Sequence, residues 1–155
     1  EDRMHCGHGI RKWESIETLY SFISMSESTR PFILQPYVEH FTDLRVIVAG
    51  DYAEAYARHN PDNFRMNMAA GGSSRPVDLD ADKERFCRDV MERGTFPYAH
   101  IDIMVASDGK YYLSEIALNG GIKGARIERV ELERRKQEIT DKLIAEYAQR
   151  VKSEE

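Results

Sequence analysis

The chain has 155 residues, of which 41% are hydrophobic and 32% are charged, and its net charge is -5. This length and composition suit one globular domain with a sizeable core and exclude a disordered chain. The acidic balance gives no electrostatic footprint for nucleic acid, and no apolar run reaches the length of a membrane span.

The first part of the chain predicts a loop, a helix and a first pair of strands. A Gly-containing loop at 5–10 precedes apolar residues at helical spacing, which predict an amphipathic helix over 14–25. FILQPYVEH (32–40) predicts a strand that Pro36 confines to a sheet edge or ends in a turn. LRVIVAGDYAEAYAR (44–58) then predicts a β-hairpin around a Gly-Asp turn, and 59–77 is typical of a loop.

The second part predicts a helix, another hairpin and a long final helix. Asp80 is a candidate N-cap for a helix that Gly94 closes. Two short apolar runs then flank Asp108-Gly109, and a charged helix follows over 125–151, with its inner side at Ile127, Val130, Ile139, Leu143 and Tyr147. Hairpins with helices before, between and after them predict an α+β domain, an antiparallel β-sheet with helices packed on it.

The register of the first hairpin brings two arginines to one face. With Gly50-Asp51 as a two-residue turn, Ala49 faces Tyr52, and alternation groups Leu44, Val46 and Val48 with three alanines that leave room for a helix. The opposite face carries Arg45 and Arg58, whose guanidinium groups suit a phosphate or a carboxylate. Taken alone, this hairpin favours the alternative of a solvated face with ion pairs, Asp43 to Arg58 and Glu54 to Arg45.

The register of the second hairpin brings two carboxylates together. With Asp108-Gly109 as a two-residue turn, Ser107 faces Lys110 and Asp102 falls opposite Glu115, with Cβ atoms roughly 4.5–5.5 Å apart. A hard divalent cation would remove the repulsion, and Asn119, four residues further, returns its amide to that face. Two alternatives stay open, solvated acids and a carboxylate pair with one raised pKa. A one-residue slip would separate the acids. His100 shares the predicted face of Asp102, either assisting the site or as a partly exposed strand residue.

Taken in order, these segments resemble the ATP-grasp family, in particular the branch of the ribosomal-protein glutamate ligases. FILQPYVEH is similar to the linker strand that holds adenine and ribose. DLRVIVAG with AEAYAR resembles paired strands that carry an Asp-x-Arg and a later Arg, and RMNMAAGG resembles an Arg-x-Asn segment that ends in Gly-Gly. IDIMVASDGKYYLSEIALNGG is similar to the closing metal hairpin. The resemblance spans residues 31 to 147.

The resemblance implies an ATP-dependent ligase, in which ATP phosphorylates a carboxylate and an amine or similar nucleophile attacks the acyl phosphate. It implies that Gln35, Tyr37, Val38 and Glu39 contact adenine and ribose, that Arg45, Arg58 and Asn67 act on phosphate or substrate, and that Asp102, Glu115 and Asn119 hold Mg²⁺ or Mn²⁺. The implied partners are ATP and a small carboxylate, without nucleic acid or membrane and with a homo-oligomer left open. Two cysteines cannot make a disulfide framework, so a reducing cytoplasm is the expected compartment.

The chain departs from the family pattern in two places. Ala117 stands where the family has the asparagine of Glu-x-Asn, and Asn119 is the candidate substitute. Upstream, only a remnant of the glycine-rich lid is recognisable, at Gly7 and Gly9, and the chain begins at Glu1. We therefore expect residues 1–30 to be a remnant of the lid with a helix, and 31–155 to be an ATP-grasp C-terminal subdomain.

Because no phosphate-binding lysine strand is recognisable before the lid, we expect the parent protein to be the ligase and this chain alone to lack the upstream half that catalysis needs. The alternative is a non-catalytic ATP-grasp-like module that binds an anionic partner or another subunit. A third hypothesis is a metal-dependent enzyme that cleaves phosphate with the same two acids.

Overall fold

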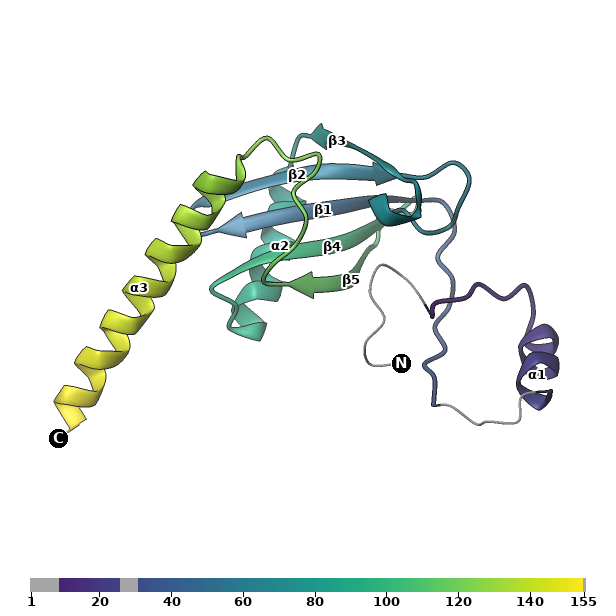
Figure 1. Ribbon diagram of the computed structural model, residues 1–155, viewed down its shortest axis with the longest axis horizontal. Coiled ribbons are helices and arrows are strands. Elements are labelled where there is room, and N and C mark those ends of the chain that lie inside the picture. The colour runs from purple at the N-terminus through teal and green to yellow at the C-terminus, as the bar shows by residue number, and fades with distance from the viewer. Residues whose placement is uncertain (1–8, 26–30, 155) are drawn as a thin grey trace.

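A five-stranded antiparallel sheet organises the chain (Figure 1). The computed structural model describes residues 9–25 and 31–154. The strands lie in the order β3-β2-β1-β4-β5, with bounds β1 Phe41–Ala49, β2 Tyr52–His59, β3 Ser73–Val77, β4 Tyr98–Ala106 and β5 Tyr111–Ala117. The helices are α1 Ile16–Ser24, α2 Ala81–Gly94 and α3 Arg129–Glu154, with a short 3₁₀ helix at Met68–Ala70. The predicted α+β class is confirmed.

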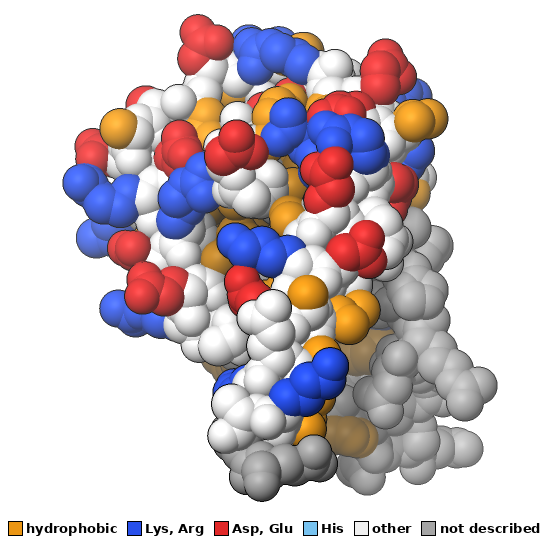
Figure 2. All heavy atoms as spheres, turned by 90° about the vertical axis from the view of Figure 1, so that its left-hand side faces the viewer, with side chains coloured by type: hydrophobic (Ala, Val, Ile, Leu, Met, Phe, Trp, Pro, Cys, Tyr) orange, Lys and Arg blue, Asp and Glu red, His pale blue; other side chains and the backbone are white. Residues whose placement is uncertain are grey.

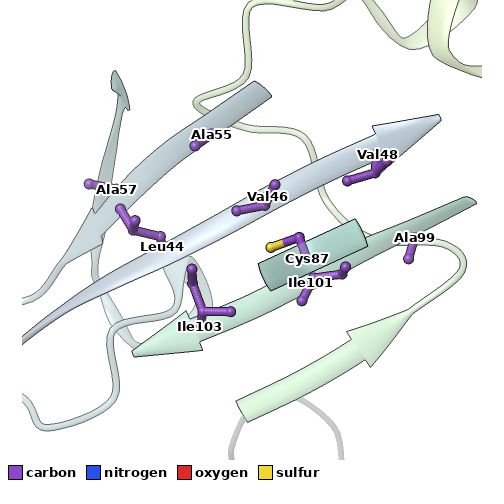
Figure 3. Packing of buried hydrophobic residues seen from close by; sticks show 9 residues of the cluster. All are labelled: Leu44, Val46, Val48, Ala55, Ala57, Cys87, Ala99, Ile101 and Ile103. Atoms are coloured by element: carbon purple, nitrogen blue, oxygen red, sulfur yellow. The ribbon is translucent and has the colours of Figure 1, made fainter. Parts of the chain in front are cut away.

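The apolar core fills the back face of the sheet, beneath α2 (Figure 3). Leu44, Val46 and Val48 point the same way as Ala55 and Ala57, as the hairpin register predicts. The small alanine side chains admit α2 close to the sheet, and the remaining members of the cluster are Cys87, Ala99, Ile101 and Ile103. This well-packed face fixes the direction of every polar side chain on the other face, because alternate residues of a strand point to opposite sides.

The front face is partly covered by chain that follows β5. The segment 118–128 crosses the sheet from β5 toward β3 before α3 begins (Figure 1). Ile47 and Tyr56 of the sheet pack there against Ile127 and Leu132, which are all buried. The Tyr56 hydroxyl also donates to the carbonyl of Gly121 at 2.7 Å. These contacts cover the apolar half of the front face.

Both hairpins bring the predicted residues together, but the second does so by a different route. In β1 and β2 the pairing runs from Asp43 with Arg58 to Ala49 with Tyr52, as predicted. In the second hairpin the amide of Ala106, and not Ser107, bonds to Lys110, so the turn has three residues. A bulge between Asp102 and Ile103 restores the alignment, and Asp102 lies opposite Glu115 as predicted.

Two segments differ from their predictions because of what a strand needs from its neighbours. Residues 32–40 do not form a strand: β1 begins at Phe41, and Pro36 lacks an amide hydrogen for a ladder. Conversely, 73–77 forms edge strand β3 inside the predicted loop, with Pro76 opposite Tyr56. Pro is tolerated there because the other side of β3 is unpaired.

The helices are close to their predicted bounds, and of the predicted inner side of the final helix only Ile127 and Ile139 pack against the core. Ser15 and Asp80 cap α1 and α2, and the left-handed residue after α2 is Thr95 rather than Gly94. Along α3 only the first half touches the sheet, through Leu132, Lys136 and Ile139, whereas Val130, Leu143 and Tyr147 are exposed. The last turns of α3 extend past the sheet (Figure 1). No helix in 9–25 or 31–154 combines the length and apolarity that a membrane crossing needs.

The sheet end from which α3 leaves carries charges of both signs. Figure 2 shows Lys and Arg side chains interspersed with Asp and Glu over this face, with hydrophobic side chains between them. On this face the positive and negative side chains are mixed and do not separate into patches of one sign.

Candidate functional site

Four charged side chains from three adjacent strands meet on the front face of the sheet. Arg45 donates to both oxygens of Asp102, from Nε at 2.6 Å and from Nη2 at 2.7 Å. Arg58 lies between two acids: its Nη2 is 2.8 Å from Asp102 Oδ2 and its Nε is 2.5 Å from Asp43 Oδ1. We refer to Asp43, Arg45, Arg58 and Asp102 as the arginine–aspartate cluster.

Burial makes these ion pairs strong. The four side chains are between 5% and 15% exposed. Burial on its own would lower the pKa of Arg45 and of Arg58, but their bonds to Asp102 and Asp43 outweigh it and raise both values. Burial raises the pKa of Asp43, and Arg58 opposes that rise only in part. Both guanidinium groups therefore stay charged, and together they balance the two carboxylates.

Of the two ion pairs that the solvated-face alternative expects, the structure contains one. The Asp43–Arg58 pair forms, whereas Glu54 does not pair with Arg45. The Glu54 carboxylate is 4% exposed and accepts the backbone amides of Arg126 at 2.8 Å and Ile127 at 3.1 Å. Glu54 therefore holds the end of segment 118–128 against the sheet, and Arg45 is left to Asp102.

Asp102 and Glu115 fit a divalent ion in charge and position, whereas Asn119 is engaged elsewhere. Register places the two acids side by side on adjacent strands, and Glu115 is exposed without a hydrogen bond or ion pair to the described residues. Asp102 is 3% exposed and both of its oxygens are held by guanidinium groups. Within the described ranges, no group of three His, Cys, Asp or Glu side chains converges as a metal site would. An ion at Asp102 and Glu115 would therefore complete its shell from phosphate or water.

A buried lysine that sequence reasoning missed holds Asn119. Lys136 of α3 donates from Nζ to Asn119 Oδ1 at 3.1 Å and to the carbonyl of Leu118 at 3.0 Å. Its side chain is 5% exposed, and its ammonium also lies 5.2 Å from the ring centroid of Tyr98. The charged run around it indicates a solvated helix face. The sequence signal that indicates burial of Lys136 is its position four residues after Leu132, on the same side of the helix.

His100 lies beneath the same segment and is fully buried, which corrects the expectation of a partly exposed residue. It is 1% exposed, and neither ring nitrogen has a hydrogen-bond partner in the described part of the chain. A Cβ on Gly120 would come within 2.8 Å of its Nδ1, so only glycine fits there. Burial, helped by the positive charges of Lys136, Arg45 and Arg129 and weakly opposed by Asp102, lowers the pKa of His100 to about 4.

This buried histidine predicts an acid-sensitive fold. Below pH 6.5, the ordinary pKa of histidine, His100 takes up a proton in the unfolded chain. In the folded chain it stays neutral until about pH 4. The free energy of unfolding should therefore fall with decreasing pH across this window, by about 1.4 kcal/mol per pH unit from this group. Urea unfolding from pH 7 to pH 4 measures the slope. His100→Leu should flatten it and exposed His59→Gln should leave it unchanged; equal slopes in all three chains would contradict the assignment.

The residues implied for adenine and ribose lie before the sheet, and Asn67 lies in the loop before β3. Gln35, Tyr37 and Glu39 are exposed and Val38 is half-buried, with the Lys12 ammonium 4.4 Å from the Tyr37 ring centroid. The predicted glycine-rich lid falls largely on residues 1–8, outside the described residues.

The Arg-x-Asn segment with its two glycines forms a tight loop beside a cavity. Asn67 caps the 3₁₀ helix by accepting the amide of Ala70 at 2.9 Å. Gly71 takes a φ of +88°, and a Cβ on Gly72 would lie 2.5 Å from the Met66 carbonyl. A cavity of about 410 Å³ adjoins this loop, and its walls include Phe41, Thr42, Arg58, His59, Met66, Ser73, Ser74 and Arg75. Of the cluster, Arg58 alone reaches this cavity.

Comparison with known proteins gives consistent matches. A family model described as the RimK-like ATP-grasp domain matches residues 5–144. The chain is 27% identical over 136 residues to the "Coenzyme gamma-F420-2:alpha-L-glutamate ligase" of Methanococcus maripaludis, covering 84% of this chain and 47% of that protein. It is 26% identical over 117 residues to the "Alpha-aminoadipate--LysW ligase LysX" of Saccharolobus solfataricus, covering 71% and 42%. The chain thus spans about half the length of the curated relatives it matches.

Among solved structures, one match is the "Chryseobacterium gregarium RiPP-associated ATP-grasp ligase in complex with ADP, and a leader and core peptide". The TM-score is 0.45 and the identity 20%, over 55% of this chain and 28% of that chain.

Proposed function

This chain belongs to the RimK-like ATP-grasp family, and on that premise we propose that it is the ATP- and metal-binding part of a carboxylate ligase. The observation that carries the proposal is the convergence of Arg45 and Arg58 on Asp102, directly opposite Glu115. Two arginines beside two acids on one sheet face provide cationic groups for phosphate oxygens and oxygen ligands for a divalent ion. The ligases named among its relatives support this assignment.

The proposed roles follow from the chemistry of each side chain. When bound, Mg-ATP would supply the phosphoryl group that converts a carboxylate to an acyl phosphate. Arg45 and Arg58 would bind phosphate oxygens and neutralise their charge, which is the main requirement of phosphoryl transfer. Asp102 and Glu115 would hold the metal, joined by Asn119 once Lys136 releases its amide. Asn67 would position phosphate or substrate.

Each substrate is assigned to a part of the structure by the residues that lie there. Gln35, Tyr37, Val38 and Glu39 would contact adenine and ribose. The cavity beside Arg58 and Arg75 would take the carboxylate substrate, because both of these walls are cationic. Residues 1–30 would belong to the lid and 31–155 to the C-terminal subdomain. We also propose a cytoplasmic location, where the thiol of Cys87, buried in the core, would stay reduced.

One observation favours a second candidate function, a binding module without catalysis. Ala117 stands where the Glu-x-Asn motif of the family has an asparagine oxygen ligand. The candidate substitute for that ligand is Asn119, and Lys136 donates to its side-chain oxygen. Such a module would use Arg45 and Arg58 for an anionic partner and would ignore the metal ion. Dependence on Mg²⁺ therefore separates the two functions.

We predict that Mg-ATP raises the melting temperature and that ATP with a chelator does not. At about 100 times its Kd a ligand adds about 2.7 kcal/mol to stability. For a chain of this size that corresponds to roughly 5–10 °C. Differential scanning fluorimetry measures the shift.

Glu115→Gln is the informative variant, because this exposed side chain makes no hydrogen bond or ion pair to residues 9–25 or 31–154 and the fold should be unaffected. It should abolish the shift. Asp108→Asn, in the turn of the same hairpin, is the matched control and should keep it. A shift that ignores the chelator would favour the binding module, and a shift that survives Glu115→Gln would remove that acid from the metal site.

A further inference from the structure

We propose that Arg45 and Arg58 exclude a free divalent metal ion from Asp102 and release this carboxylate only when a phosphate group competes for their guanidinium groups. This inference deepens the proposed function and rests on it. It concerns the order of binding at the site: metal and nucleotide enter together, and the metal does not bind first.

Both carboxylate oxygens of Asp102 already contact guanidinium groups. An ionised carboxylate offers about four lone-pair positions. Arg45 takes one on each oxygen, and Arg58 Nη2 forms an ion pair with Oδ2 at 2.8 Å. Asp102 is also 3% exposed, so a hydrated ion would have to displace at least one guanidinium group to reach it. Glu115 is exposed and has no hydrogen-bond or ion-pair partner in the part of the chain that the structure describes, but it is a single carboxylate and makes a poor site alone.

The charges of the arginine–aspartate cluster also disfavour a free dication. Asp43 and Asp102 carry two negative charges, and Arg45 and Arg58 carry two positive charges. The cluster is therefore neutral as it stands. A dication at Asp102 would lie within a few ångströms of both guanidinium groups, in a partly buried setting that screens repulsion poorly. Free metal thus gains little attraction from the cluster.

A phosphate group reverses both effects. Guanidinium groups bind phosphate as well as carboxylate in a bidentate manner. Once Arg45 turns to a phosphate, Asp102 Oδ1 is freed and the added negative charge favours a dication between the phosphate and the two acids. Arg58 can stay on Asp43 during this exchange, because its Nε already bonds that carboxylate. The metal would therefore arrive with its nucleotide.

The test measures Mn²⁺ binding to the full chain, by the loss of the free-ion electron paramagnetic resonance signal. Mn²⁺ alone should show no site that Asp102→Asn removes. Arg45→Met should create such a site, with binding at least about tenfold tighter than in the wild-type chain, equivalent to about 1.4 kcal/mol. The double variant Arg45→Met/Asp102→Asn should lose it. Circular dichroism checks that each variant is folded.

The first comparison that decides the proposal is between the wild-type chain and a folded Asp102→Asn chain. If Mn²⁺ alone binds the wild-type chain at a site that Asp102→Asn removes, the proposal is overturned. A folded Arg45→Met chain that gains no Mn²⁺ site also overturns it. Failure of the proposed function gives a different result, in which Mn²⁺ and ATP together leave the melting temperature of the wild-type chain unchanged from that with Mn²⁺ alone.

Discussion

Replacing Asp102 with asparagine is expected to lower the free energy of unfolding by about 3–5 kcal/mol, the cost of breaking a buried ion pair from one side. The asparagine side chain has nearly the same shape but no charge, so Arg45 would lose the carboxylate that accepts two of its hydrogen bonds, while the exposed Glu115 still acts on its charge. Arg58 would keep Asp43 as its partner. Urea unfolding at neutral pH, monitored by circular dichroism, gives the value.

The control for this prediction removes the whole pair. In Arg45→Met/Asp102→Leu, two apolar side chains replace two buried charges, and the Asp43–Arg58 pair remains intact. Such replacements are often neutral or stabilising, so the double variant should recover most of the loss. If the double variant were less stable than Asp102→Asn alone, packing rather than charge would dominate at this position.

Replacing Glu54 with alanine is expected to cost about 3–5 kcal/mol, because the amides of Arg126 and Ile127 would both lose a charged acceptor. Segment 118–128 should detach from the sheet first. Hydrogen exchange followed by mass spectrometry should therefore show faster exchange of this segment and of the first turns of α3 at denaturant concentrations where the strands remain protected.

A glutamate on the surface provides the comparison. Glu92 of α2 is exposed, and its side chain makes no hydrogen bond or ion pair to the described residues, so Glu92→Ala should change stability by less than about 0.5 kcal/mol. Should Glu54→Ala behave like Glu92→Ala, the carboxylate of Glu54 does not anchor the segment. Uniform acceleration of exchange across the sheet would instead indicate that this contact contributes to global rather than local stability.

Alternation along the strands was enough to predict which side chains share a face. Leu44, Val46 and Val48 turned to the core, and Arg45 and Arg58 turned away from it, because one oily face fixes the other. The pairing of Asp102 with Glu115 was correct although the turn was wrong. A three-residue turn with Gly109 at a φ of +81° moved the strand by one position, and the bulge moved it back.

What the sequence did not reveal are contacts between positions distant in the chain. Glu54 accepts hydrogen bonds from the amides of Arg126 and Ile127, which lie 72 and 73 positions further along the chain. No local pattern distinguishes it from a solvated acid. Lys136 lies in a charged run that is typical of an exposed helix, yet the crossing of segment 118–128 buries it. His100 was placed on the correct face, but its burial depends on the same segment. Each of these residues required the path of the chain after β5.

The bulge beside Asp102 also bears on how this hairpin can change in evolution. Turn length and the alignment of the two acids are set at separate places, the first at residues 107–109 and the second at Ser114, the extra residue of β5. A deletion at the tip could be compensated by a deletion near Ser114, and the acids would still face each other. Homologous hairpins with tips of different length are therefore compatible with one geometry at their bases, and gaps there should come in compensating pairs.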